Sequence, residues 1–122
     1  MKNHKLTSES KVVNGVTLFR IEACVDLKWA KKGEVGGWVE KIDNVYGDAW
    51  VSGNAQVSGN ARVYGDAQVY GNAQVYGNAW VSGDAQVYGK LKLSLGYFFG
   101  LRYRKEEINY QKLDDDYELI YK

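Results

Sequence analysis

The chain has 122 residues, a formal net charge of +1 and 45% hydrophobic residues, so it has room for one small core and no overall attraction to nucleic acid or anionic membranes. It contains no run approaching the roughly 18 apolar residues that a membrane-spanning helix needs. Its only cysteine, Cys24, cannot form an internal disulfide, and no apolar run follows the N-terminal lysines. Both features lead us to expect a cytoplasmic protein that does not enter membranes.

Residues 1–38 are predicted to form an N-terminal hairpin followed by an irregular lead-in. Asn14-Gly15 lies between two alternating runs rich in β-branched residues, and this pair favours a type I′ hairpin turn because both of its central residues need positive φ. In the second arm, strand alternation predicts that one set of side chains faces one side and another set the other side. The first set is Thr17, Phe19, Ile21 and Ala23, and the second is Leu18, Arg20 and Glu22. We expect this hairpin to cover one open end of the repeat that follows.

A six-residue repeat fills the middle of the chain from Val45 to Gly89. Each unit reads Val, Tyr or Ser, Gly, Asn or Asp, Ala, and then a variable larger residue. A short fixed period is typical of a β-solenoid, in which a unit buries its apolar residues only by stacking on its neighbours. Alternation places Ala and Val inside and the variable residue outside. The Gly-Asn or Gly-Asp pair is predicted to make the corner, with positive φ at both residues.

The register of the repeat extends further back and indicates the size of a coil. Counting back in sixes from Val45 gives Val39, so Trp38 holds the same position as Trp50 and Trp80. Three aspartates recur every 18 residues, with Asn at the corners between them: Asp48, Asp66 and Asp84. We therefore predict an all-β fold with a short three-sided parallel β-helix of 18 residues per coil over residues 39–95. Two open ends of such a helix would expose unpaired strand edges unless both were capped.

Residues 96–122 are predicted to form the second cap. Just before them, Leu91, Leu93 and Leu95 alternate with polar residues, which favours a strand, and residues 97–99 (YFF) form a bulky apolar plug. The last two alternating runs flank Asp114, Asp115 and Asp116, which favours a C-terminal β-hairpin. A helix over residues 104–113 is the weaker alternative.

The repeat and its lead-in resemble a known group of proteins. The hexads resemble those of the left-handed parallel β-helix. The lead-in and the first hexads are similar to the polymer-forming, hexapeptide-repeat proteins of unknown function found in bacteria, prophages and phages. The similarity lies in the pieces LFRIEA, KKGEVGGWVE and NVYGDAWVSGNA. The resemblance covers roughly residues 10–89. It implies the left-handed β-helix fold and a phage or prophage origin, and it implies no activity.

Catalysis is not expected on this scaffold. The acyltransferases and carbonic anhydrases known on left-handed β-helices depend on histidine chemistry, whereas this chain has a single histidine, His4, near an end that we expect to fray. The aspartate column is one candidate for a cation site, but single corner carboxylates are well solvated turn formers, and we favour that interpretation. We expect no enzyme activity, no cofactor and no metal.

The outward aromatic and arginine residues are the candidate binding residues, since Tyr, Trp and Arg dominate binding hot spots. They are Trp50, Arg62, Tyr64, Tyr70, Tyr76, Trp80 and Tyr88 in the repeat, with Arg102 and Arg104 beyond it. Stacking of the tyrosines into ladders that only stabilise the coil is an equally good interpretation. The expected partner is a protein, or a second copy of the chain. Nucleic acid bound through stacked aromatics is less favoured because the net charge is near zero.

These residues predict a non-enzymatic protein-interaction module. With the phage origin that the resemblance implies, one specific hypothesis is an inhibitor of a host defence system, such as an anti-CRISPR protein. The alternatives are a self-assembling scaffold that forms a homo-oligomer, and, with less support, a glycan or small-molecule binder.

Overall fold

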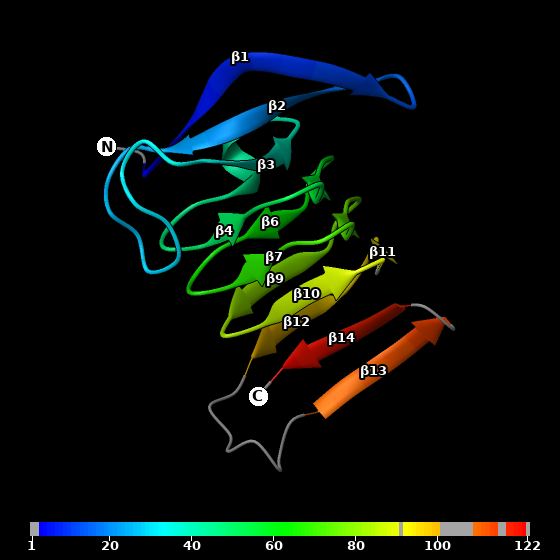
Figure 1. Cartoon of the computed structure of the whole chain (residues 1–122). Helices are drawn as coiled ribbons and strands as arrows, with labels where there is room; N and C mark the ends of the chain where they lie inside the picture. The colour runs from blue at the N-terminus through cyan, green and yellow to red at the C-terminus, as the bar shows by residue number, and fades with distance from the viewer. Residues whose placement is uncertain (1–2, 91, 101–108, 115–116, 122) are drawn as a thin grey trace.

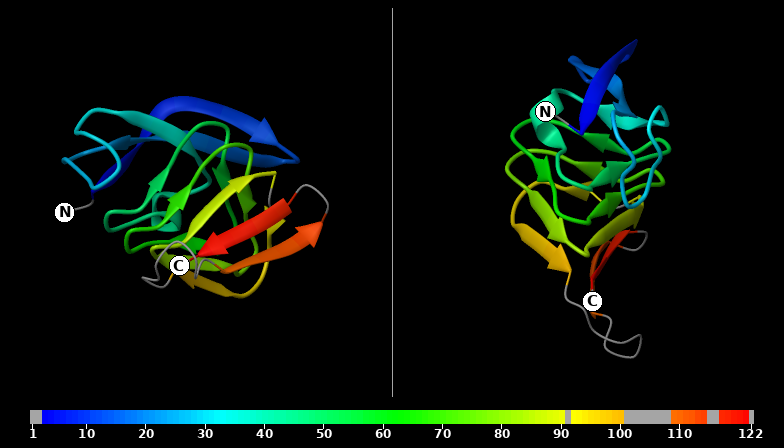
Figure 2. Two further views of the ribbon diagram at one scale, coloured as in Figure 1. Left: turned by 60° about the horizontal axis from the view of Figure 1, so that its bottom comes forward. Right: turned by 90° about the vertical axis from the view of Figure 1, so that its left-hand side faces the viewer.

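Successive hexads of the chain wind into stacked coils of short parallel strands (Figure 1). The computed structural model describes residues 3–90, 92–100, 109–114 and 117–121. The coil strands are β3 (Val35–Val39), β4 (Trp50–Val51), β5 (Gln56–Val57), β6 (Arg62–Val63), β7 (Gln68–Val69), β8 (Gln74–Val75), β9 (Trp80–Gly83), β10 (Gln86–Gly89), β11 (Lys92–Leu93) and β12 (Tyr97–Gly100). Figure 2 shows the coils between two hairpins, β1 (His4–Val13) with β2 (Val16–Ala23), and β13 (Asn109–Asp114) with β14 (Tyr117–Tyr121).

The strands form three sheets, one for each side of the coil. Val57 pairs with Val75, Val51 with Val69, and Val63 with Val81, each partner lying 18 positions further along the chain. We name the three outer surfaces by their features. The hairpin face belongs to β3, β5, β8 and β11, the tyrosine face to β4, β7 and β10, and the arginine face to β6, β9 and β12. The predicted three-sided coil of 18 residues is confirmed.

A tight turn forms each corner, and glycine alone supplies its positive φ. Gly65 has φ +68°, and a Cβ on it would lie 2.9 Å from the backbone nitrogen of Gly83 in the next coil. The prediction that the following Asn or Asp also has positive φ is wrong, because Asn14 is the one non-glycine residue with positive φ in the described part of the chain. Positive φ at the first central residue alone is the pattern of a type II′ turn. The corner asparagines instead form amide ladders, with Asn54 Nδ2 donating to Asn72 Oδ1 at 3.3 Å and Asn60 Nδ2 to Asn78 Oδ1 at 3.4 Å.

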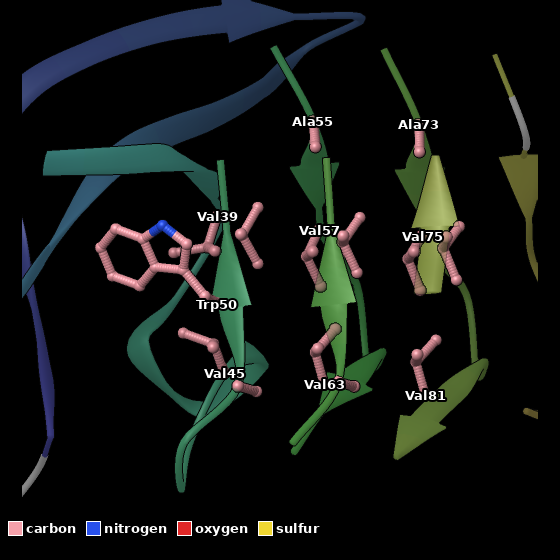
Figure 3. Packing of buried hydrophobic residues seen from close by; sticks show 14 of the residues in the cluster. Val39, Val45, Trp50, Ala55, Val57, Val63, Ala73, Val75 and Val81 are labelled. Carbon is pink, nitrogen blue, oxygen red and sulfur yellow. The ribbon is translucent and has the colours of Figure 1, made fainter. Parts of the chain in front are cut away.

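The core consists almost entirely of one alanine and one valine from each hexad. From Val39 to Val87 these alanines and valines are at most 1% exposed. Figure 3 shows Val39, Val57 and Val75 in one row and Val45, Val63 and Val81 in another. Because every coil buries the same small residues, each added coil extends the core without changing its cross-section.

The N-terminal hairpin closes the first coil, as predicted. Asn14 and Gly15 have φ +52° and +81°, which fits the type I′ turn. β2 pairs antiparallel with β3, with Phe19 opposite Val39. Ile21 and Ala23 join the solenoid core, as predicted, but Leu18 is buried while Thr17 is exposed, so the predicted alternation is wrong in the first half of β2. The pairing of β2 with β3 shifts register between Arg20 and Glu22.

Side chains also cap the first coil edge on the arginine face, beside the 3₁₀ turn η1 (Ile42–Asn44). Asn44 is fully buried, and its Nδ2 donates to the carbonyl oxygens of Gly59 at 3.2 Å and Ala61 at 2.8 Å. Its Oδ1 accepts from the backbone N–H of Lys41 at 2.9 Å, and Glu40 Oε1 accepts from the N–H of Gly59 at 2.7 Å. These bonds satisfy backbone groups that no earlier coil can reach.

The C-terminal end departs from the regular repeat. Leu93 is buried but Leu95 is 72% exposed, so the predicted strand through Leu95 is wrong; the chain turns there and Gly96 takes φ +107°. Tyr97 pairs with Trp80, 17 rather than 18 positions away, and Phe98 packs against the core. The predicted C-terminal hairpin is present as β13 and β14, and β14 pairs antiparallel with β10. Residues 109–114 are strand, which contradicts the alternative of a helix over 104–113 in that part.

The all-β parallel helix with an N-terminal hairpin cap and a C-terminal β cap is thus confirmed. The left-handed sense of its coils and the boundaries at residues 38/39 and 95/96 stay predictions.

Candidate binding surfaces

The arginine face carries an ordered cluster of four side chains, Tyr46, Arg62, Tyr64 and Trp80. The rings of Tyr46 and Tyr64 stack with centroids 5.5 Å apart, and Trp80 meets Tyr64 edge-on at 6.0 Å. Arg62 Nη1 donates to the Tyr46 hydroxyl at 3.1 Å, and its guanidinium lies 5.7 Å from the centre of the Trp80 ring. Each of these pairs joins neighbouring coils, so the solenoid register itself assembles the cluster.

Arg62 remains a cation in this setting. The hydrogen bond to Tyr46, and then the electrostatic attraction to that side chain, raise the pKa of the guanidinium above its ordinary value. The side chain is exposed, and Trp80 is 36% exposed beside it. A hollow of about 620 Å³ adjoins the pair, lined by Asn60, Arg62, Asn78, Trp80, Leu95 and Gly96. The surface therefore combines a fixed positive charge, a flat ring and free space.

The tyrosine face carries a second ladder. Tyr70 and Tyr88 stack with centroids 5.2 Å apart and planes 8° from parallel, and the Tyr70 hydroxyl donates to Gln86 Oε1 at 3.3 Å. Burial, and then the neighbouring Tyr88, raises the pKa of Tyr70 above its ordinary value. Trp29 reaches this side from the lead-in, and its Nε1 donates to the carbonyl oxygen of Asp66 at 2.8 Å. Hence the predicted tyrosine stacking is present on two of the three faces.

The hairpin face is partly overhung by the N-terminal hairpin. Tyr76 is 37% exposed on this face. A groove of about 320 Å³ separates the hairpin from the coils, lined by Val13, Asn14, Val16, Leu18, Gln56, Ser58, Gln74, Tyr76 and Lys92. Tyr76 is thus not on the same surface as Arg62, and the candidate residues do not form one site.

The prediction that Trp50 is an outward binding residue is wrong. Trp50 is only 4% exposed and belongs to the core cluster, and Figure 3 shows its indole beside the valine rows. A Cβ on Gly36 would lie 2.7 Å from the indole, and the His4 ring lies nearly parallel to it at 6.1 Å. The N-terminal segment covers this first-coil tryptophan, whereas Trp80, which lies one coil and two faces further on, stays at the surface.

His4 is not in a frayed end, contrary to our expectation. It is 2% exposed, and Nε2 lies 2.7 Å from the carbonyl oxygen of Ala49. Its other nitrogen, Nδ1, is buried without a hydrogen-bond partner in the described structure. Burial lowers the pKa of His4, against smaller raising effects of the Ala49 carbonyl and the Asp48 charge. The residue therefore contributes to the cap as a neutral imidazole.

The aspartate column does stack, since the coil register places Asp48, Asp66 and Asp84 one above another. Asp66 pairs with Lys28 at 3.3 Å. Within the described residues, no three His, Cys, Asp or Glu side chains gather in a geometry suited to a metal ion. Arg102 and Arg104 lie outside the described residues.

Sequence reasoning missed the groove and the polar caps. One feature of the sequence indicates the groove, namely the three valines next to the Asn-Gly turn, Val12, Val13 and Val16. A hairpin tip in water seldom carries so many apolar residues, so they suggest that the tip contacts something. Val12 is 67% exposed. The sequence gives no indication that Asn44 and Glu40 cap the first coil, because it does not distinguish a buried polar residue from an exposed one in the lead-in.

Comparison with known proteins agrees with this architecture. The family model described as the YdcK Beta solenoid repeat matches residues 55–71, 67–83 and 73–89. A search of curated proteins gives no match to the chain. No helix among the described residues is both long enough and apolar enough to cross a membrane. The repeat match and the stacked coils together lead to one conclusion: the chain is a β-solenoid repeat protein, similar in its repeats to the YdcK type.

Proposed function

We propose that this protein is a non-enzymatic protein-binding module and that the arginine face is its binding surface. The observation that carries the proposal is the fixed geometry of Arg62, held by the Tyr46 hydroxyl at 3.1 Å and packed over Trp80 at 5.7 Å. Arg and Trp are the commonest hot-spot residues. Because this pair is already ordered in the free protein, a partner meets little entropic cost in immobilising it.

The size of the face favours a different protein over a second copy. The face covers three strand spacings, from Val45 to β12. At about 4.8 Å per spacing and about 3.3 Å per residue along a six-residue side, its projected area is roughly 300 Å². A stable interface takes about 800 Å² from each partner. Two copies that meet face to face would therefore associate only weakly, whereas a partner that also reaches around a corner can bury enough area.

Pull-down with the immobilised full chain tests the proposal. Wild type is compared with the double variant Arg62→Ala, Trp80→Ala and with Gln68→Ala, which changes the same repeat position on the tyrosine face. We expect a stoichiometric partner that wild type and Gln68→Ala retain and the double variant loses. Recovery of no stoichiometric partner, or equal recovery by all three proteins, would contradict the proposal. Light scattering at high concentration tests the self-assembly alternative, which requires a stable oligomer.

We further propose that the partner is a component of a host defence system, such as a CRISPR effector. The support is the similarity of the lead-in and hexads to proteins of phages and prophages and the small size of the chain. Co-expression with a defence system that restricts a test phage should restore plaque formation. The double variant on the arginine face should fail to do so. If the wild-type protein restores no plaques against any defence system tested, the anti-defence role is rejected. The pull-down then still decides whether the protein is a binding module.

A further inference from the structure

The hairpin overhangs the coils and leaves part of β2 without a neighbour on one side. β2 pairs with β1 from Val16 onward, but its pairing with β3 begins only at Phe19. Figure 1 shows the hairpin tip projecting beyond β3. β3 ends at Val39, and the chain then bends at Glu40 into the 3₁₀ turn η1. The pairing with β1 turns the N–H and C=O groups of Val16 and Leu18 toward β1, so Thr17 between them presents the strand backbone that the described coils do not pair.

The groove below this part of β2 has one apolar side and one polar side. Val13, Val16 and Leu18 line it from the hairpin, together with Asn14 of the turn. Leu18 is 2% exposed yet lies outside the solenoid core cluster, as does Trp38. Trp38 is covered by Lys11 at 4.2 Å and Arg20 at 5.3 Å from its ring. The overhang is thus packed against the coils at its base, which keeps the groove preformed.

The polar side is built from repeat positions and is unused within the described chain. Gln56, Gln74 and Lys92 occupy the same repeat position in three successive coils, as their strand pairing shows. With Ser58 and Tyr76 they line the groove. None of these five side chains bonds to another described residue. The equivalent outer residue on the tyrosine face, Gln86, accepts a bond from Tyr70. Two amides, two hydroxyls and an ammonium group are therefore available to a ligand.

We propose that this groove binds an extended, acidic peptide segment of a partner protein. An extended strand satisfies the free backbone N–H and C=O of Thr17 by strand addition, the mode in which main-chain bonds give affinity and alternate side chains give specificity. Apolar side chains of the peptide face Val13 and Val16, and its other side chains face the amides. Lys92 is the one charged residue among those lining the groove, so charge complementarity selects carboxylates. This site is separate from the arginine face and does not depend on it.

Fluorescence anisotropy with three labelled heptapeptides tests the proposal. The first alternates Glu and Val, the second alternates Lys and Val, and the third is the first with its central Val replaced by Pro, which cannot donate a main-chain hydrogen bond there. We expect the full chain to bind the first peptide, with affinity falling as salt rises. Equal binding of the lysine peptide or the proline peptide would overturn the proposal.

Two pairs of variants locate the site on the protein. Lys92→Glu replaces an attraction with a repulsion and should weaken binding about tenfold, whereas Lys90→Glu, an exposed residue outside the groove lining, should leave it unchanged. Val16→Ser should weaken binding, and Val12→Ser, which is exposed and does not line the groove, should not. Circular dichroism confirms folding of each variant. Equal effects within either pair, or a dimer of the free chain that excludes the peptide, would overturn the assignment.

Discussion

His4 and Ala49 link the first strand of the chain to the first complete coil. The imidazole Nε2 lies 2.7 Å from the Ala49 carbonyl oxygen while Nδ1 is buried without a described partner. A carbonyl oxygen only accepts hydrogen bonds, so Nε2 carries the proton and Nδ1 does not. Protonation of Nδ1 would place an unpaired N–H and a charge inside the cap.

The first prediction concerns pH. Because burial lowers the pKa of His4 in the folded state, below about pH 6.5 the unfolded chain binds a proton that the folded chain does not, and stability falls. The melting temperature should drop between pH 7.5 and 5.5 in wild type and change less in His4→Phe. Since the chain has one histidine, its NMR titration is unambiguous. Titration at or above the ordinary pKa would show that this account is wrong.

The second prediction compares two tryptophans at the same repeat position. Trp50→Ala removes a buried ring and should cost about 3 to 5 kcal/mol of unfolding free energy. Trp80→Ala removes a partly exposed ring and its contacts with Tyr64 and Arg62, and should cost at most about 1.5 kcal/mol. Urea unfolding measures both, with Trp50→Phe as a milder variant if Trp50→Ala does not fold. Similar costs for the two alanine variants would contradict the burial difference.

The third prediction concerns the side-chain cap of the first coil. Asn44→Ala leaves the Gly59 and Ala61 carbonyl groups and the Lys41 N–H without their partner, and we expect a loss of about 2 to 3 kcal/mol. Asn54→Ala is the control, because this exposed corner residue makes one ladder bond at 3.3 Å, and its loss should be below about 1 kcal/mol. Chemical denaturation distinguishes these values, and a mild effect at Asn44 would reject its capping role.

The fourth prediction separates backbone strain from crowding at glycine. Gly65→Ala and Gly33→Ala both place a side chain at positive φ, but only Gly65 meets a neighbouring coil within 4 Å. Gly65→Ala should therefore be at least about 1 kcal/mol more destabilising than Gly33→Ala. Thermal unfolding of the two variants measures the difference. Equal losses would mean that the coils can separate locally to admit a Cβ.

The repeat could be predicted in detail because its rules are local. Each hexad places a glycine at a corner and an alanine and a valine inside, and stacking follows from the identical length of the units. The same uniformity is why Trp50 and Trp80 could not be told apart. Their hexads are alike, and only the distant His4 and Gly36, packed over one of them, decide which is buried. The groove likewise depends on where the hairpin folds back, which no hexad encodes.

Because residues 18 positions apart pair with each other, the number of residues between two positions decides whether they lie on the same face. Deleting one hexad between Arg62 and Trp80 would keep every corner and core residue in its repeat position, yet all later residues would move by one face. Arg62 would then no longer lie beside Trp80, and β10 with its partner β14 would join a different sheet. Deleting three hexads would shorten the rod by one coil and leave every face with its own kind of residue. A protein built this way can change length in steps of a hexad if only its core must survive. It must do so in steps of a whole coil if its surfaces are to keep their partners.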